Sequence, residues 1–339
     1  MRPLLLMLLL GSMSACGVLS PMQGPSYPPL VLDWSQTLYE LETFPYHPRD
    51  FGQARFMKGE QTPRAGLVVL PSKDRFVRGF DARTGQLLWE SETRGPNVAP
   101  PVAVGEDFLL ASLDGHVYRM HQRNGRVVWD SGSLGKGALY RAPVIDGERV
   151  FVTGDDDRIT ALSLSEGTRL WERDRPSLSS RSVVSRITAH AGPALFKESV
   201  LTGFSDGRLV AFDVRDGATL WVRDLSDGAR EFVDVDSTPV ITSTGVALVS
   251  SYAKGLYGID AKNGEIAWKV QGEGFGQITE HEGTVYVTRS KQALDPDSSS
   301  SLETASLSAL DPTTGTFLWT LRLGETTPGL PAVSSKYLL

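Results

Sequence analysis

The chain has 339 residues, of which 40% are apolar, and its formal net charge is −6. It contains no run of five or more basic residues, which argues against nucleic acid as a partner. Its single cysteine excludes both a disulfide framework and a cysteine-based metal site.

Residues 1–15 have the pattern of a signal peptide. Arg2 supplies a positive charge, and the apolar stretch Leu4 to Leu10 is too short to span a bilayer. The small pair Ser14-Ala15 precedes Cys16 and resembles the lipobox of bacterial lipoproteins, whose cleavage would leave Cys16 as a lipidated N-terminus. The alternative is an ordinary secretory signal in which Cys16 is incidental. Gly17, in place of the aspartate that retains lipoproteins at the inner membrane, favours the outer membrane facing the periplasm.

Residues 16–30 follow as a flexible tether rich in proline, glycine and serine. The predicted domain then occupies residues 31–339, and it repeats. Each of six copies places a glycine four residues before a tryptophan, and successive tryptophans lie 40 to 51 residues apart. These tryptophans are Trp89, Trp129, Trp171, Trp221, Trp268 and Trp319. Such a period predicts an all-β fold, a β-propeller of four-stranded antiparallel blades with six clear blades and a partial seventh.

The period over residues 142–173 shows four short apolar strands separated by turns, with Asp155-Asp156-Asp157 as an exposed turn rather than a calcium loop. We expect the repeated glycine to need positive φ and the tryptophan ring to wedge between blades. The polar stretch Gln292 to Ala305 is expected to be an exposed loop. Leu330 and the residues after it are expected to begin the seventh blade. Either the sequence is incomplete by about one and a half blades, or a strand around Trp34 closes a smaller ring.

The repeat Ala-x-Asp-x-x-Thr-Gly-x-x-x-Trp is similar to the docking motif of pyrroloquinoline-quinone-type propellers, a group that includes dehydrogenases. Their quinone site implies a vicinal cysteine pair and calcium ligands. This chain has no cysteine pair, and its five histidines form no ligand spacing. We therefore predict no catalytic residues, no metal and no cofactor. The alternative is a quinone- and calcium-dependent, dehydrogenase-like or ligand-binding propeller; a further alternative is an envelope adhesion or signalling propeller.

The lipobox, the tether and the propeller together resemble the BamB family, eight-bladed lipoproteins of the outer-membrane β-barrel assembly machinery. Three segments carry the resemblance: Leu32 to Leu38, similar to the family's ring-closing opening strand; Pro176-Ser-Leu-Ser-Ser-Arg181; and Val233-Asp-Val-Asp-Ser-Thr-Pro239. The resemblance implies a non-catalytic scaffold that docks the barrel-inserting subunit BamA through the last two segments. It also implies that propeller edges are offered to nascent outer-membrane proteins by strand addition.

Carried over position by position, the resemblance makes Leu178 an apolar contact and Arg181 a cationic contact of this docking surface. Asp234 and Asp236 become the acidic partners on the neighbouring loop. Ser180 stands where a second apolar residue is usual, which places the manner of contact in question. The alternative is that Arg181, Asp234 and Asp236 pair with one another and order the two loops.

Overall fold

A computed structural model of the chain describes residues 34–36, 52–58, 66–175, 191–227, 234–235, 237–251, 254–294 and 301–324. The chain divides into two compact units, Met1–Ser35 and Gln36–Leu339. Within the described residues all regular structure is β-strand, and no helix there is long and apolar enough to cross a membrane. The residues expected to begin a seventh blade lie outside the described part.

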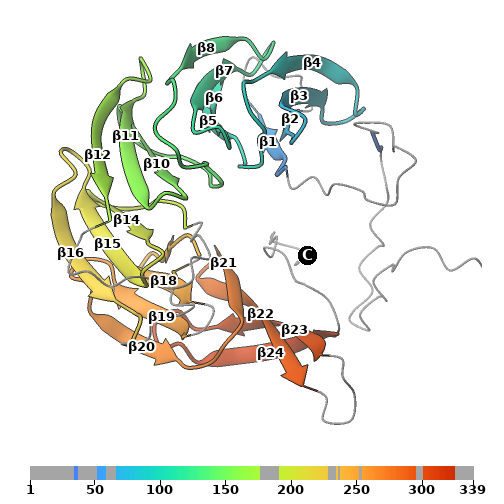
Figure 1. Cartoon of the computed structure of the whole chain (residues 1–339). Coiled ribbons are helices and arrows are strands. Elements are labelled where there is room, and N and C mark those ends of the chain that lie inside the picture. Colours follow the sequence, from blue (N-terminus) through green and yellow to red (C-terminus); the bar gives the residue numbers. More distant parts are fainter. Residues whose placement is uncertain are drawn as a thin grey trace, which may run out of the picture. The chain divides into compact units, whose positions relative to one another are not determined.

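Six antiparallel sheets of four strands follow one another along the second unit (Figure 1). The first three blades consist of β1 (Arg55–Met57), β2 (Leu67–Pro71), β3 (Phe76–Asp81) and β4 (Leu87–Glu92); β5 (Val102–Val104), β6 (Asp107–Ala111), β7 (Val117–His121) and β8 (Val127–Asp130); and β9 (Val144–Asp146), β10 (Arg149–Gly154), β11 (Arg158–Ser163) and β12 (Arg169–Asp174). The other three consist of β13 (Ala194–Phe196), β14 (Ser199–Gly203), β15 (Arg208–Asp213) and β16 (Thr219–Asp224); β17 (Val240–Ile241), β18 (Val246–Ser251), β19 (Gly255–Asp260) and β20 (Ile266–Val270); and β21 (Phe275–His281), β22 (Thr284–Leu294), β23 (Ser301–Leu310) and β24 (Phe317–Gly324). The all-β propeller prediction and its six blades are confirmed.

The core lies between the blades rather than within one of them. Each of five buried apolar clusters combines side chains from two successive blades. Between blades 2 and 3, for example, Leu109 and Val117 pack with Val150 and Leu162, and all four are fully buried. Strands buried on both faces explain the short apolar runs in the sequence.

The tryptophan on the fourth strand of a blade docks onto the next blade. Its indole Nε1 donates to a backbone carbonyl there, at distances from 2.9 Å (Trp89 to Gln122) to 3.2 Å (Trp171 to Val214). The same bond is made by Trp129, Trp221 and Trp268. Trp89 and Trp171 are 8% and 7% exposed, whereas Trp319, on the last described blade, is 42% exposed. The rings of the first five motif tryptophans lie between blades, as predicted.

The motif glycine supports this docking in two ways. All six motif glycines have φ between 65° and 73°, so the predicted positive φ is confirmed. At Gly125, a Cβ atom would also lie 2.4 Å from Cε3 of the Trp89 ring. Any side chain here is therefore both strained and in collision with the preceding blade.

The second residue after the tryptophan forms another bond to the next blade. Ser91 Oγ donates to the Gly125 carbonyl at 2.8 Å, and Arg173 Nε donates to that of Gly217 at 3.0 Å. Gln36 makes the same bond at the first blade, where Nε2 donates to the Gly85 carbonyl at 2.8 Å. Gln36 lies two residues after Trp34 in the predicted opening segment, of which only residues 34–36 are described, and they form no strand.

Every fourth strand has a β-bulge immediately before its tryptophan. In β4, Trp89 pairs with Gly79 and Leu87 pairs with Phe80, so Leu88 is the extra residue. The same shift recurs in the other five blades, where the extra residues are Val128, Leu170, Leu220, Ala267 and Leu318. We call these six residues the bulge residues; the leucines and Val128 are 42% to 59% exposed.

Two sequence expectations need correction. The stretch 292–305 is not a loop throughout, because β22 and β23 remain paired from Gln292 with Glu303 to Leu294 with Ser301. Asp155 to Asp157 do form the turn between β10 and β11, but Asp157 is not exposed: its side chain is 14% exposed and bonds to the next blade. Polar composition alone did not reveal either arrangement, because backbone pairing and inter-blade contacts depend on distant segments.

Candidate docking surface

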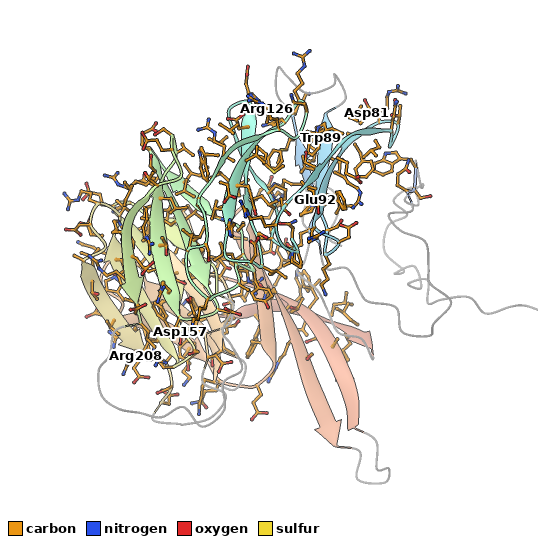
Figure 2. The ribbon with its side chains drawn as sticks, turned by 45° about the horizontal axis from the view of Figure 1, so that its top comes forward. Asp81, Trp89, Glu92, Arg126, Asp157 and Arg208 are labelled. Atoms are coloured by element: carbon orange, nitrogen blue, oxygen red, sulfur yellow. The ribbon has the colours of Figure 1, made fainter. Side chains whose placement is uncertain are left out.

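Four charged side chains lie where the chain leaves blade 3, just before the segment that contains Leu178 and Arg181. We call these residues, Asp157, Arg175, Asp206 and Arg208, the root of the first loop. Arg175, directly after β12, donates its backbone N–H to the Asp157 carbonyl at 3.0 Å. Its guanidinium lies 3.4 Å from the Asp157 carboxylate and 3.7 Å from that of Asp206 in blade 4. Arg208 pairs with the same Asp206 at 3.0 Å. Figure 2 shows Asp157 and Arg208 close to each other at this end of the blades.

Asp157 also ties blade 3 to blade 4. Its Oδ1 accepts the backbone N–H of Ser205 at 2.9 Å, and its Oδ2 accepts the Ser205 hydroxyl. Asp157 adopts a φ of 61°, where the turns of blades 2 and 4 have Gly115 and Gly207 at 81° and 84° and that of blade 1 has Arg75 at 73°. An aspartate in the place of a turn glycine accepts backbone strain, and here the strained position lets its carboxylate reach the next blade.

Burial changes the electrostatics of this root. Desolvation raises the pKa of Asp206, and the neighbouring Asp157 carboxylate adds to that effect. The cations Arg208 and Arg175 oppose it. The root therefore keeps its ion pairs only while Asp206 is ionised, which makes it more sensitive to acid than an exposed aspartate would be.

The far end of the first loop returns at Ala191 and is fixed to the second loop. The Ala191 carbonyl accepts the Thr153 hydroxyl at 2.7 Å. The Gly192 N–H donates to Oγ1 of Thr238, which follows the second loop, at 2.9 Å. This bond joins the described residues that flank the segments 176–190 and 228–233 directly.

The second loop has buried roots of its own. Leu225 is fully buried and donates its N–H to the Gly207 carbonyl at 2.8 Å. On the return, Val235 is fully buried and forms a bridge with Ser251. Ser237 Oγ accepts the Ser250 N–H at 2.8 Å. These contacts fix where the loop begins and ends.

Of the four predicted docking residues, the structure describes one. Leu178, Arg181 and Asp236 lie outside the described residues, as does Cys16. Asp234 is described, and it is only 5% exposed. The structure therefore brings the loop roots together, while the contacts of Leu178, Arg181 and Asp236 remain predictions.

Sequence reasoning missed the residues that build the loop roots, above all Arg175, Asp157, Asp206 and Thr238. One signal was available for Asp157: the sister turns read Asp114-Gly115 and Asp206-Gly207, and this turn replaces the glycine with aspartate. Among the described residues, no three histidine, cysteine or carboxylate side chains are placed to hold a metal ion.

The fold and the site together define a tryptophan-docked β-propeller with two inter-blade loops fixed on a shared root. A family model described as outer membrane protein assembly factor BamB matches residues 73–321. The chain therefore belongs to the BamB family.

Individual relatives agree with this assignment. The chain is 27% identical over 258 residues to the BamB protein of Yersinia pestis, across 75% of this chain and 53% of that protein. It is 30% identical over 129 residues to BamB of Escherichia coli K12, across 34% of this chain and 32% of that protein. The chain thus spans about half the length, or less, of the curated relatives it matches.

Solved structures show the same fold. The crystal structure of BamB from Moraxella catarrhalis superposes with a TM-score of 0.64 at 19% identity, covering 85% of this chain and 84% of that one. The quinohemoprotein alcohol dehydrogenase of Comamonas testosteroni superposes with a TM-score of 0.57 at 13% identity, covering 81% and 62%. At such low identity, both likenesses concern the fold alone.

Proposed function

We propose that this chain is a non-catalytic, lipid-anchored scaffold of outer-membrane β-barrel protein assembly. It docks a BamA-like barrel-inserting subunit through the loops 176–190 and 228–237, and it assists insertion of outer-membrane proteins. The observation that supports the proposal is the bond between Gly192 and Thr238, because it joins the described ends of the two loops. Blade packing does not require such loops; the blades without them are complete four-stranded sheets.

Within this surface we assign different roles to the candidate residues. Leu178 supplies the apolar contact, and Arg181 the cationic one. Asp234 orders the second loop instead of facing a partner, since a side chain that is 5% exposed offers little surface for docking. Asp236, one residue after the buried Val235, is the acidic partner on that loop.

Replacing Arg181 with glutamate is expected to reduce recovery of the BamA-like subunit at least about fivefold. The variant replaces a cation that would pair with the partner by a negative charge that would repel it. The measurement is co-purification from detergent-solubilised envelopes. Arg83→Glu is the matched control: Arg83 lies on an exposed β3–β4 turn, at the other end of the strands, and should leave recovery unchanged. Equal recovery with both variants would contradict the docking assignment.

Replacing Cys16 with alanine is expected to move most of the protein from the outer-membrane fraction to the soluble periplasmic fraction. The reason is that the acyl chains on Cys16 would provide the stable attachment, and the docking loops alone would not. Sucrose-gradient fractionation with immunoblotting measures the shift. Retention of the alanine variant in outer membranes after high-salt washing would show that another part of the chain anchors it.

A quinone-dependent dehydrogenase is the competing function. The dehydrogenase likeness is one of fold, and the described residues include no cluster suited to calcium. The direct test adds pyrroloquinoline quinone and calcium to the purified chain and measures alcohol and aldose oxidation with an artificial electron acceptor. Turnover above that of heat-inactivated protein would replace the scaffold proposal.

A further inference from the structure

The β3–β4 turn and its equivalents in the other blades hold negative charge in most of the molecule. Asp81 Oδ1 accepts the backbone N–H groups of Arg83 at 3.0 Å and Thr84 at 2.8 Å. Asp213, Asp260 and Asp311 accept the corresponding N–H groups in blades 4, 5 and 6 at 2.8, 2.8 and 2.7 Å. A pair of turn N–H groups around a carboxylate is a small anion-binding nest.

Hydrogen bonds from turn residues lower the pKa of three of these carboxylates. Hydrogen bonds from Arg215 lower the pKa of Asp213 to about 2. The backbone N–H of Thr84 is the leading cause of the lowered pKa of Asp81. The hydroxyl and N–H of Thr313 likewise lower the pKa of Asp311. The turn therefore favours a negatively charged occupant.

Blade 2 has the same turn but lacks this carboxylate. His121 stands where four of the sister turns have aspartate and that of blade 3 has Ser163, and among the described contacts no side-chain acceptor binds the N–H groups of Arg123 or Asn124. The turn conformation is nevertheless kept, with Gly125 at a φ of 65° and its N–H bonded to the His121 carbonyl at 2.9 Å. The nest is thus formed without its built-in anion.

A cavity of about 320 Å³ lies at this turn, and cationic groups line it. Its lining residues are Glu106, His121, Arg123, Asn124 and Arg126. The two arginines outnumber the single carboxylate of this set. Figure 2 shows Arg126 at the same end of the blades as Asp81, the carboxylate that fills the turn of blade 1.

A buried carboxylate, that of Asp107, lies beside His121. The Asp107 side chain is 8% exposed, and its Oδ2 accepts from Nε of Arg119 at 2.6 Å. Its Oδ1 lies 2.9 Å from Nδ1 of His121. Since Nδ1 lies beside the Asp107–Arg119 ion pair, we assign Nε2 of His121 to the ligand.

We propose that the blade 2 turn is a binding site for a phosphate group, held by the N–H groups of Arg123 and Asn124 and by the side chains of His121, Arg123 and Arg126. The phosphate replaces the aspartate of the sister turns. Several convergent donors suit a tetrahedral oxyanion, and Arg guanidinium groups pair well with it. The cavity leaves space for the organic group to which the phosphate belongs.

His121→Asp is the decisive variant, because it restores the carboxylate of the sister turns and fills the nest. Inorganic phosphate, titrated into the purified full chain in a phosphate-free buffer by calorimetry, should bind to the wild type at least about tenfold more tightly than to this variant. Arg126→Gln should also weaken binding, by removing one charged donor while leaving the nest open.

The control is Arg215→Gln, which removes an arginine from the blade 4 turn, where Asp213 fills the nest; phosphate binding should not change. Because His121→Asp places a second carboxylate opposite the buried Asp107, its thermal unfolding is measured beside its binding, and Arg126→Gln, which leaves Asp107 and His121 intact, keeps the test independent of folding. Absence of phosphate binding to the wild type would overturn the proposal. Equal binding in the wild type, His121→Asp and Arg126→Gln would overturn it as well.

A vesicle-binding experiment distinguishes a lipid headgroup from a soluble phosphate compound as the source of the phosphate. It uses the Cys16→Ala chain, so that the proposed lipid anchor does not hold the protein to membranes. Co-sedimentation with phosphatidylglycerol vesicles that is lost in Cys16→Ala/His121→Asp identifies a lipid headgroup. Binding of inorganic phosphate without co-sedimentation identifies a soluble phosphate compound. This site does not depend on the docking loops, so its failure would leave the scaffold proposal intact.

Discussion

Truncating Trp171 to alanine is expected to lower the free energy of unfolding by about 3–5 kcal/mol. The indole is 7% exposed, packs against Phe151 with ring centroids 5.7 Å apart, and donates Nε1 to the Val214 carbonyl at 3.2 Å. The variant loses the apolar contacts between blades 3 and 4 and leaves that carbonyl without its donor. Urea denaturation followed by tryptophan fluorescence and circular dichroism measures the change.

Trp319→Ala is the matched control for this prediction. Trp319 has the same motif position, but it is 42% exposed, and no described blade follows it. Its ring contacts Tyr286 of its own blade at 6.0 Å between centroids. Its loss should cost only about 1 kcal/mol, in proportion to the smaller buried area. Equal costs for the two variants would mean that docking onto a following blade contributes little to stability.

Replacing Gly167 with alanine is expected to cost about 2–5 kcal/mol, from two separable causes. The φ of 71° at Gly167 is unfavourable for any residue with a Cβ, by about 1–2 kcal/mol. In addition, the new Cβ would lie 2.5 Å from Cε3 of Trp129, and relieving that collision costs about 1–3 kcal/mol more. The displaced indole would also strain its bond to the Leu164 carbonyl.

Gly147→Ala separates the two causes. Gly147 has a φ of 54°, and a Cβ there would meet no atom within 4 Å. Only the backbone cost applies, so about 1 kcal/mol is expected. A denaturation series comparing both variants measures the ring contact as their difference. If the two alanines destabilise the protein equally, the glycine is retained for φ alone.

The repeat made the blades, the docking tryptophans and the positive φ of the glycines predictable, because each is a local requirement repeated six times. The root of the docking surface was not predictable in the same way. Its bonds, such as Asp157 to Ser205 or Gly192 to Thr238, join residues about 50 positions apart. Only the packing of blade on blade brings them together. The repeat pattern does not predict such contacts, since they are made by residues that differ from the repeat.

His121 and Asp157 are two such residues: one belongs to the proposed phosphate site and the other joins two blades. His121 stands where four sister turns have aspartate, and Asp157 stands where those of blades 2 and 4 have glycine. The extended pairing of β22 with β23 illustrates the opposite limit. Its sequence around residues 292–305 is polar and serine-rich, so side-chain pattern predicted a loop where backbone bonds continue a strand.

The bulge residues have a consequence for solubility. Each of the six described blades ends in an edge strand whose outer backbone groups pair with no described strand, and such edges invite pairing with other chains. The bulge before each tryptophan breaks the regular spacing of those groups at the place where apolar side chains such as Leu88 and Leu318 are most exposed. A propeller edge can therefore carry an apolar residue on every blade and still resist growing into a larger sheet.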